Sequence, residues 1–166
     1  MHVILDSFAV WLRSTTLSEA IRVLPWLWPV CEIVHFIGLS LLVGVVGFFD
    51  LRLLGLFARV PLNAAWSLMP WGKAGFALAM ITGLTFFIGA PDQYVTNVAF
   101  YGKLAFLAIA GLNAVCFERI YGPTVAASDA RGATPLAFKA IGAVSILCWF
   151  LVIYWGRMLP FVGNAF

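Results

Sequence analysis

The sequence alternates between long apolar stretches and short polar connections. Four stretches are long enough to cross the hydrocarbon core of a bilayer, which takes about 20 helical residues. They cover about residues 28–49, 69–89, 98–117 and 138–159. Because the connections are short, neighbouring helices are expected to pack antiparallel. The pattern therefore predicts an all-α fold, a transmembrane four-helix bundle with up-down topology.

Two shorter segments precede the first span. The apolar side chains of residues 2–13 fall near one face of a helix, a pattern typical of a helix lying in the membrane interface. Residues 17–25 repeat this pattern, and Thr16 followed by Glu19 predicts a capping box at the start of the second helix. We therefore expect residues 1–27 to form two interfacial helices.

The composition agrees with one membrane domain that covers residues 1–166. Hydrophobic residues make up 63% and charged residues 10% of the chain, whereas a soluble domain carries roughly 25% charged residues. The formal charge is +3, but the basic residues sit at predicted helix ends and form no patch, which argues against nucleic acid as a partner. The expected partner is the lipid bilayer, with a homo-oligomer or a larger membrane complex left open.

The basic residues also predict an orientation. The first–second and third–fourth connections both carry Lys and Arg, whereas the second–third connection carries none. Short cytoplasmic loops are enriched in these residues. The expected location is a bacterial cytoplasmic (inner) membrane that the chain crosses several times, with both termini on the periplasmic side. The residues that carry this prediction are Arg52, Arg59, Lys73, Arg119, Arg131 and Lys139.

Ionisable side chains inside the predicted spans point to a candidate site. Glu32 and His35 lie three residues apart in the first span, and helical residues at this spacing share a face. From the rise of about 1.5 Å per residue, Lys103 and Arg157 fall in the same outer-leaflet layer, and Glu32 is expected to pair with one of them. Asn113 shares a face of the third span with Lys103. Such intramembrane groups mark functional sites by default.

A second charged layer lies toward the cytoplasmic boundary. It consists of Asp50, Arg52, Lys73 and Glu118. At the end of a span, such residues are typical of a solvated belt that fixes the helix ends. We therefore expect this layer to be structural.

The outer layer suggests a haem or porphyrin site. A buried imidazole can ligate haem iron, and basic side chains can hold the propionates. On this interpretation His35 is the metal ligand and the other polar residues of the layer surround haem b. The second axial position would be filled by His2 or Met158, left open, or filled from a second protomer.

Other interpretations stay open. Glu32, His35 and Lys103 can instead form a structural polar network in a non-catalytic membrane subunit or homo-oligomeric scaffold. A copper or other metal site would use Cys31, His35 and Met158. A transporter is less favoured because no broken-helix repeat is evident. Motifs for nucleophilic catalysis and phosphate binding are missing, and the sequence leaves open whether the protein is an enzyme.

The motif W-P-x-x-E-x-x-H-x-x-G at 28–38, followed by D-L-R-L-L-G at 50–55, resembles an uncharacterised bacterial family of small four-span membrane proteins. The resemblance also takes in Phe100, Lys103 and Asn113, and the G-R pair at 156–157. It covers nearly the whole chain but implies no function.

A more distant resemblance is to HemJ-type protoporphyrinogen oxidases and to the membrane domain of CopD-type copper-resistance proteins. The matching positions are His35, Gly83 and Lys103. This resemblance implies haem b or porphyrin binding, with His35 as axial ligand and Lys103 near the substrate or a propionate. The expected function is that of an integral membrane protein that binds the cofactor in the outer-leaflet half of the bundle and takes part in electron transfer.

Overall fold

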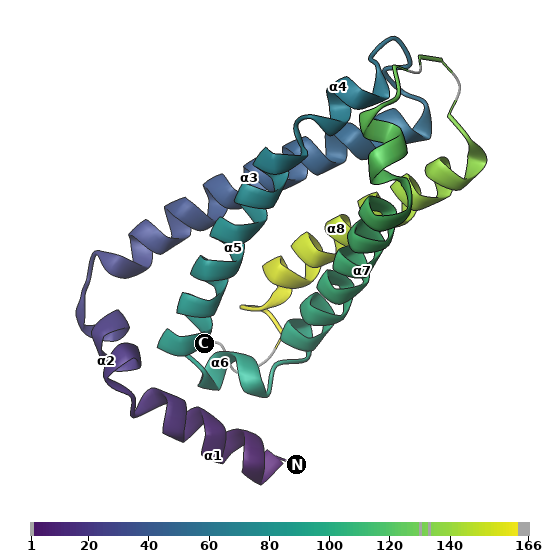
Figure 1. The fold of residues 1–166 in the computed structure, drawn as a ribbon. Coiled ribbons are helices and arrows are strands. Elements are labelled where there is room, and N and C mark those ends of the chain that lie inside the picture. Colours follow the sequence, from purple (N-terminus) through teal and green to yellow (C-terminus); the bar gives the residue numbers. More distant parts are fainter. Residues whose placement is uncertain (1, 130, 133, 163–166) are drawn as a thin grey trace.

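The computed structural model describes residues 2–129, 131–132 and 134–162, and every regular element among them is a helix (Figure 1). Four long helices form the body: α3 (Leu27–Leu54), α5 (Met69–Gly89), α7 (Val98–Ala126) and α8 (Leu136–Met158). Four short helices accompany them: α1 (His2–Arg13), α2 (Thr16–Val23), α4 (Leu62–Trp66) and α6 (Asp92–Val95). The predicted all-α fold with two short N-terminal helices is confirmed.

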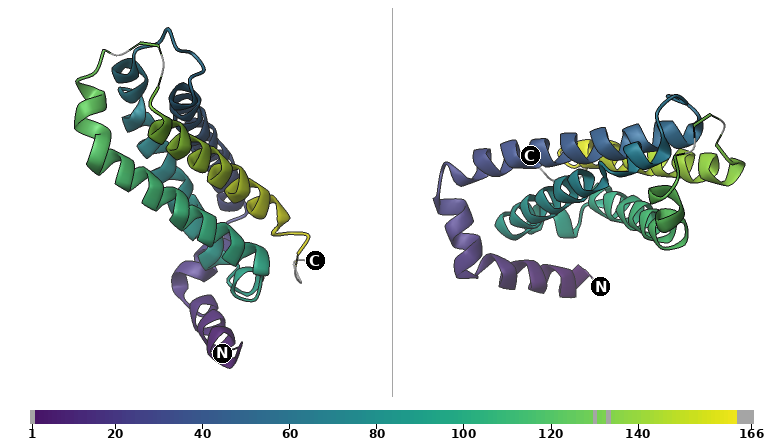
Figure 2. Two further views of the ribbon diagram at one scale, coloured as in Figure 1. Left: turned by 90° about the vertical axis from the view of Figure 1, so that its right-hand side faces the viewer. Right: turned by 45° about the horizontal axis from the view of Figure 1, so that its top comes forward.

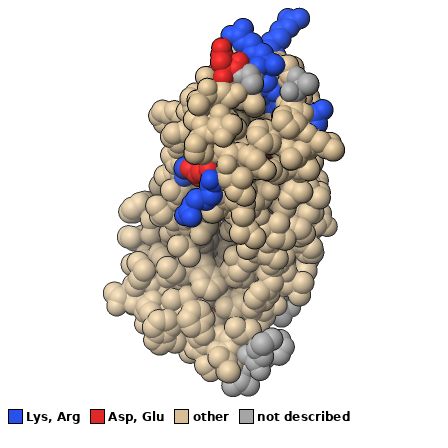
Figure 3. All heavy atoms as spheres, turned by 45° about the vertical axis from the view of Figure 1, so that its right-hand side comes forward, with Lys and Arg blue, Asp and Glu red and all other residues tan. Residues whose placement is uncertain are grey.

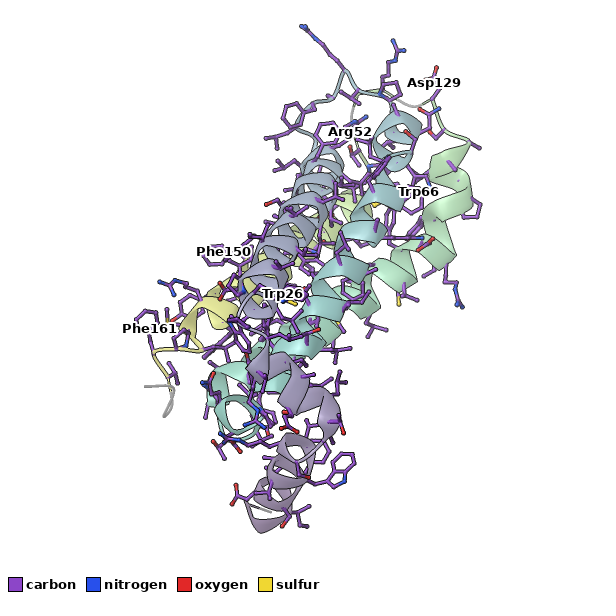
Figure 4. All side chains as sticks on the ribbon, turned by 90° about the vertical axis from the view of Figure 1, so that its left-hand side faces the viewer. Trp26, Arg52, Trp66, Asp129, Phe150 and Phe161 are labelled. Carbon is purple, nitrogen blue, oxygen red and sulfur yellow. The ribbon has the colours of Figure 1, made fainter. Side chains whose placement is uncertain are left out.

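The long helices have the length and composition of membrane spans. Four segments qualify, and the second of them joins α4 to α5, from Leu62 to Gly89. Large apolar side chains remain exposed on the outer surface of the bundle, among them Ile81, Leu112 and Phe150, the last of which is labelled in Figure 4. An apolar surface of this kind is typical of a protein that is surrounded by lipid acyl chains rather than by water. The protein is an integral membrane helical bundle.

The chain runs up and down, so the described ends of the chain lie at the same end of the bundle (Figure 1). Helix α3 packs against α5 on one side and α8 on the other, and α7 packs against α8. Direct contact between α5 and α7 is slight by comparison. The space between α5 and α7 contains the two cavities described below.

Two long helices extend beyond their predicted ends. Helix α3 continues to Leu54 and stops at Gly55, whose φ of 100° lies in the left-handed region that glycine adopts without strain. Helix α7 continues to Ala126 and contains Pro123 near its end. Because proline has no backbone N–H, the last turns of the helix lack one hydrogen bond. The third span was predicted to end at about residue 117, and the structure extends this helix by nine residues, through 118–126.

The N-terminal helices fold against the end of the bundle that carries α6 (Figure 2). The N-cap of α2 is Thr15, whose hydroxyl accepts a hydrogen bond from Ser18 N–H at 3.3 Å. The capping box predicted for Thr16 and Glu19 is therefore wrong by one residue. The buried Ser18 donates its own hydroxyl to Ile88 O at 2.8 Å, which attaches α2 to α5.

The opposite end of the bundle is closed by a buried cluster and by Arg52. The cluster consists of Phe49, Leu53, Leu62, Ala65, Phe117 and Val125. Arg52 is 1% exposed, and it donates to Val60 O at 2.6 Å and to Thr134 Oγ1 at 3.0 Å. It thereby joins α3 to both connections at this end, where Figure 4 labels it near Trp66.

The solvated charge belt expected at this end is only partly present. Asp50 and Arg52 are buried, whereas Lys73 and Glu118 form a partly exposed ion pair. The prediction of a solvated position is wrong for Asp50 and Arg52, because α8 and the two connections cover the face of α3 on which they lie. Figure 3 shows Lys, Arg, Asp and Glu gathered mainly at one end of the face in view, above a broad uncharged surface.

Candidate functional site

A cavity of about 360 Å³ lies between the four long helices, in the half of the bundle nearer the termini. Helix α3 contributes His35, α5 contributes Met80 and Gly83, α7 contributes Lys103, and α8 contributes Val152. The remaining lining is apolar or aromatic, and contains no Asp or Glu among the described residues. The cavity therefore combines an apolar volume with two basic side chains.

His35 is held in one orientation by α5. Its Nδ1 lies 2.7 Å from Thr82 Oγ1, and that hydroxyl donates to Leu78 O, also at 2.7 Å. Because the single hydroxyl proton is committed to the carbonyl, the imidazole must donate from Nδ1. The Ala79 carbonyl is a backbone acceptor next to the same side of the ring. Nε2 then carries the lone pair, and none of the hydrogen bonds found in the described part of the chain involves it.

Space beside the imidazole depends on Gly83. A Cβ placed there would lie 3.7 Å from His35 Cε1, at van der Waals contact. A larger side chain at Gly83 would therefore fill the cavity in front of the ring. The structure thus places Gly83 directly beside His35.

Lys103 reaches the same cavity from α7. Its aliphatic chain and Nζ pass over Gly156 of α8, where an added Cβ would lie 3.7 Å from Nζ. Within the described ranges, Lys103 makes no hydrogen bond or ion pair, although it is close enough to act electrostatically on His35. An unpaired ammonium in an apolar cavity favours an anionic or strongly accepting ligand.

Glu32 and Arg157 lie away from this cavity. Glu32 is exposed, accepts a hydrogen bond from Trp28 Nε1 at 3.2 Å, and lies near Tyr94, whose pKa is raised by burial and by this carboxylate. Arg157 is exposed and stacks over Phe161 at 5.0 Å. The predicted pairing of Glu32 with a basic residue of the third or fourth span is therefore wrong.

The ion pairs of the structure are elsewhere. In the ranges that the structure describes they join Arg13 to Asp92 and Lys73 to Glu118. The first attaches α1 to α6, and the second joins α5 to α7 next to the second cavity. Both are largely solvent-accessible, so neither neutralises the groups around His35.

Asn113 lies in a second cavity of about 240 Å³, on the other side of the bundle's middle. Its Nδ2 donates to Ile141 O at 3.3 Å. The two cavities share Leu42, Phe76 and Trp149 in their walls, so they are adjacent along the space between α5 and α7. Of the five residues predicted to form one site, the structure thus brings together His35 and Lys103.

Two residues next to His35 were not predicted, namely Thr82, which hydrogen bonds to the imidazole, and Met80, which lines its cavity. Asp50 was expected in a solvated belt, whereas it is buried and lines the second cavity. Thr82 is one of few hydroxyl residues in the second span, which is the signal that could have marked it as a partner for His35.

In the described residues, no three or more His, Cys, Asp or Glu side chains lie close enough together to bind a metal ion. The side chain of His2, a possible second ligand in the sequence, lies outside the described part of the structure. Met158, the other possibility, does not line the cavity of His35, whereas Met80 does.

No family model, curated protein or solved structure matches the chain.

Proposed function

We propose that the protein binds haem b or a related porphyrin in the cavity of His35 and takes part in electron transfer across or within the membrane. One observation carries the proposal. The imidazole of His35 is anchored through Nδ1 to Thr82, while Nε2, without a hydrogen bond among the described residues, belongs to a ring that lines an apolar cavity shared with Lys103.

The anchored imidazole has the arrangement expected of a metal ligand. Metal-binding histidines almost always donate their other ring N–H to a fixed acceptor, which sets the tautomer and the ring orientation. Thr82 and the Ala79 carbonyl supply such acceptors to His35. Because haem iron is held by the macrocycle, one protein ligand suffices, in keeping with the lack of a multi-residue metal cluster in the described part of the chain.

The cavity also offers suitable surroundings for part of a porphyrin. Its volume of about 360 Å³ lies within the range of about 300–1,000 Å³ typical of ligand pockets. The apolar walls suit the macrocycle, and the Lys103 ammonium suits a propionate carboxylate. The Met80 thioether lines the same cavity and would be available as a further ligand to the iron.

Bound haem would supply one-electron chemistry to the site. In this proposal His35 holds the iron, Thr82 keeps the imidazole in its ligating tautomer, and Lys103 holds a carboxylate. The surrounding apolar side chains exclude water from the cavity, and the polarity around a haem is one of the factors that set its reduction potential.

The test is the absorption spectrum of protein purified from cells supplied with haem precursor. We expect a Soret band with about one haem per chain, and loss of that band in His35→Ala. Asn113→Ala is the matched control, because this residue lines the other cavity and should leave the spectrum unchanged. A colourless wild-type protein, or full haem content in His35→Ala, would overturn the proposal.

The alternative is a non-catalytic membrane subunit or homo-oligomeric scaffold in which the polar residues only fix the helices. It predicts that His35→Ala lowers thermal stability with no pigment to lose. The direct network expected among Glu32, His35 and Lys103 is not formed, since no hydrogen bond found in the described residues joins any two of them. This favours a ligand-binding role for the cavity.

We also propose that the protein lies in a bacterial inner membrane with both termini periplasmic. Exposed Arg59 and Arg131 at the α3–α4 and α7–α8 connections support this orientation, because cytoplasmic loops favour basic residues. The haem cavity then lies in the outer leaflet.

A further inference from the structure

The second cavity has a different chemistry from the first. It lies between α3, α5, α7 and α8, with one wall closed by α4. Aromatic rings line much of it, namely Phe49, Trp66, Phe76, Phe117 and Trp149. A carboxyl group, that of Asp50, is part of the same lining. An apolar, aromatic volume therefore surrounds an acidic side chain inside the membrane-spanning body.

Asp50 has no cationic partner in the described residues. The residue is 3% exposed, and its Oδ2 is buried without a hydrogen bond there. The Ser145 hydroxyl is the polar side chain that acts on the carboxyl group. Backbone packing fixes the position, since a Cβ added to Gly142 of α8 would lie 3.0 Å from Asp50 O. This close contact with α8 holds the backbone of Asp50 inside the bundle.

The nearby basic residues are engaged elsewhere. The Lys73 ammonium is paired with Glu118, so these two charges cancel at the edge of the cavity. Arg52 donates to Val60 and Thr134 at the end of the bundle. Since Lys73 and Glu118 cancel, an ionised Asp50, as it would be beside a bound cation, gives the cavity lining one net negative charge.

We propose that this cavity binds a small lipophilic organic cation, an ammonium ion with an apolar substituent, with Asp50 as its counter-ion. An ammonium group would form an ion pair with the unpaired carboxylate. A cation that lies over aromatic faces gains a further, cation–π attraction, which is stronger when water is excluded. The volume of about 240 Å³ suits a molecule with one ring. A metal cation is less well served, because hard cations take about six or more oxygen ligands, and the lining is mostly apolar.

The site is independent of the proposed haem cavity. The two share part of a wall, but His35 and Lys103 line only the first, and Asp50 and Ser145 only the second. The first presents positive charge and the second negative charge. A ligand that fits one is therefore electrostatically disfavoured in the other.

The experiment uses the full chain in nanodiscs of phosphatidylcholine and the probe benzyltrimethylammonium, followed by titration calorimetry. We expect saturable binding of one cation per chain. Neopentylbenzene, the uncharged molecule of the same shape, should not displace it. Equal binding of the two compounds, or no saturable binding of the cation, overturns the proposal without any variant.

Variants then locate the site. Asp50→Asn keeps the shape of the side chain and should weaken cation binding by roughly tenfold or more. Glu32→Gln makes the same charge change on an exposed part of the same helix and should leave the affinity within about twofold. His35→Ala should also bind the cation normally, which separates this site from the haem proposal. Unchanged affinity in folded Asp50→Asn would refute the assignment.

Discussion

Gly38 of α3 and Gly75 of α5 bring the two helix backbones into contact. A Cβ added to Gly75 would lie 2.7 Å from Gly38 O, and one added to Gly38 would lie 2.9 Å from Gly75 O. Small residues allow such close approach between membrane helices. The contact sits one turn from His35 and two turns from Thr82, so it sets the distance across which these two side chains hydrogen bond.

Gly75→Ala is therefore expected to destabilise the protein. The new methyl group would meet Leu42 N at 2.6 Å, and backbone cannot move aside as a flexible side chain can. Overpacking of this kind costs about 1–3 kcal/mol. Thermal unfolding in detergent, followed by circular dichroism, measures the loss.

Gly44→Ala is the control for this prediction. Gly44 lies in the same helix, but nothing is within 4 Å of an added Cβ. Alanine gains up to about 1 kcal/mol in helix propensity there. If the two variants unfold at the same temperature, the backbone contact does not hold α3 and α5 together.

Thr82→Val should change the tautomer of His35. Valine keeps the shape of the side chain but cannot accept the Nδ1–H hydrogen bond, so the population of the Nδ1–H form should fall. Nitrogen-15 NMR of the imidazole reports the tautomer, and the sequence has only two histidines, so His2→Asn leaves one signal. Thr85→Val is the control, because its hydroxyl donates to Ile81 O within the same helix. An unchanged spectrum in Thr82→Val would show that the threonine does not fix the ring.

The spans could be predicted from the sequence because bilayer thickness fixes their length and composition. Residues 69–89 form α5 as predicted. The candidate site was harder to predict. Each span is apolar on all sides, so the sequence does not show which face of the helix points into the bundle. Glu32 and His35 share a face only within about 60°, and that difference leaves Glu32 exposed while His35 lines the cavity. The burial of Asp50 depends on its contact with α8, which no local pattern encodes.

Arg52→Gln should destabilise the end of the bundle that carries α4. The substitution removes charge-assisted hydrogen bonds to Val60 O and Thr134 Oγ1 in a site that is 1% exposed. Hydrogen bonds to charged groups contribute about 1.5–3 kcal/mol each, so the loss of two such bonds is expected to cost about 3–6 kcal/mol. Thermal unfolding measures it, and hydrogen exchange should show faster opening of the two connections.

Arg59→Gln serves as the comparison for Arg52. Arg59 lies in the same connection but is exposed. Surface substitutions of this kind usually stay within about 0.5 kcal/mol. Equal stability of the two variants would mean that Arg52 is not the residue that joins α3 to the connections.

The orientation can be tested with single cysteines. Cys116 is exposed and would be replaced by alanine, while Cys31 and Cys148 are buried and can stay. Gln93→Cys in α6 and Asp129→Cys after α7 then place exposed thiols at opposite ends of the bundle. Because basic residues of short loops favour the cytoplasm, we expect a membrane-impermeant maleimide to label Gln93→Cys in intact cells and Asp129→Cys only after permeabilisation. The reverse pattern would place the His35 cavity in the cytoplasmic leaflet, and any electron partner of the proposed haem would then have to be sought on that side.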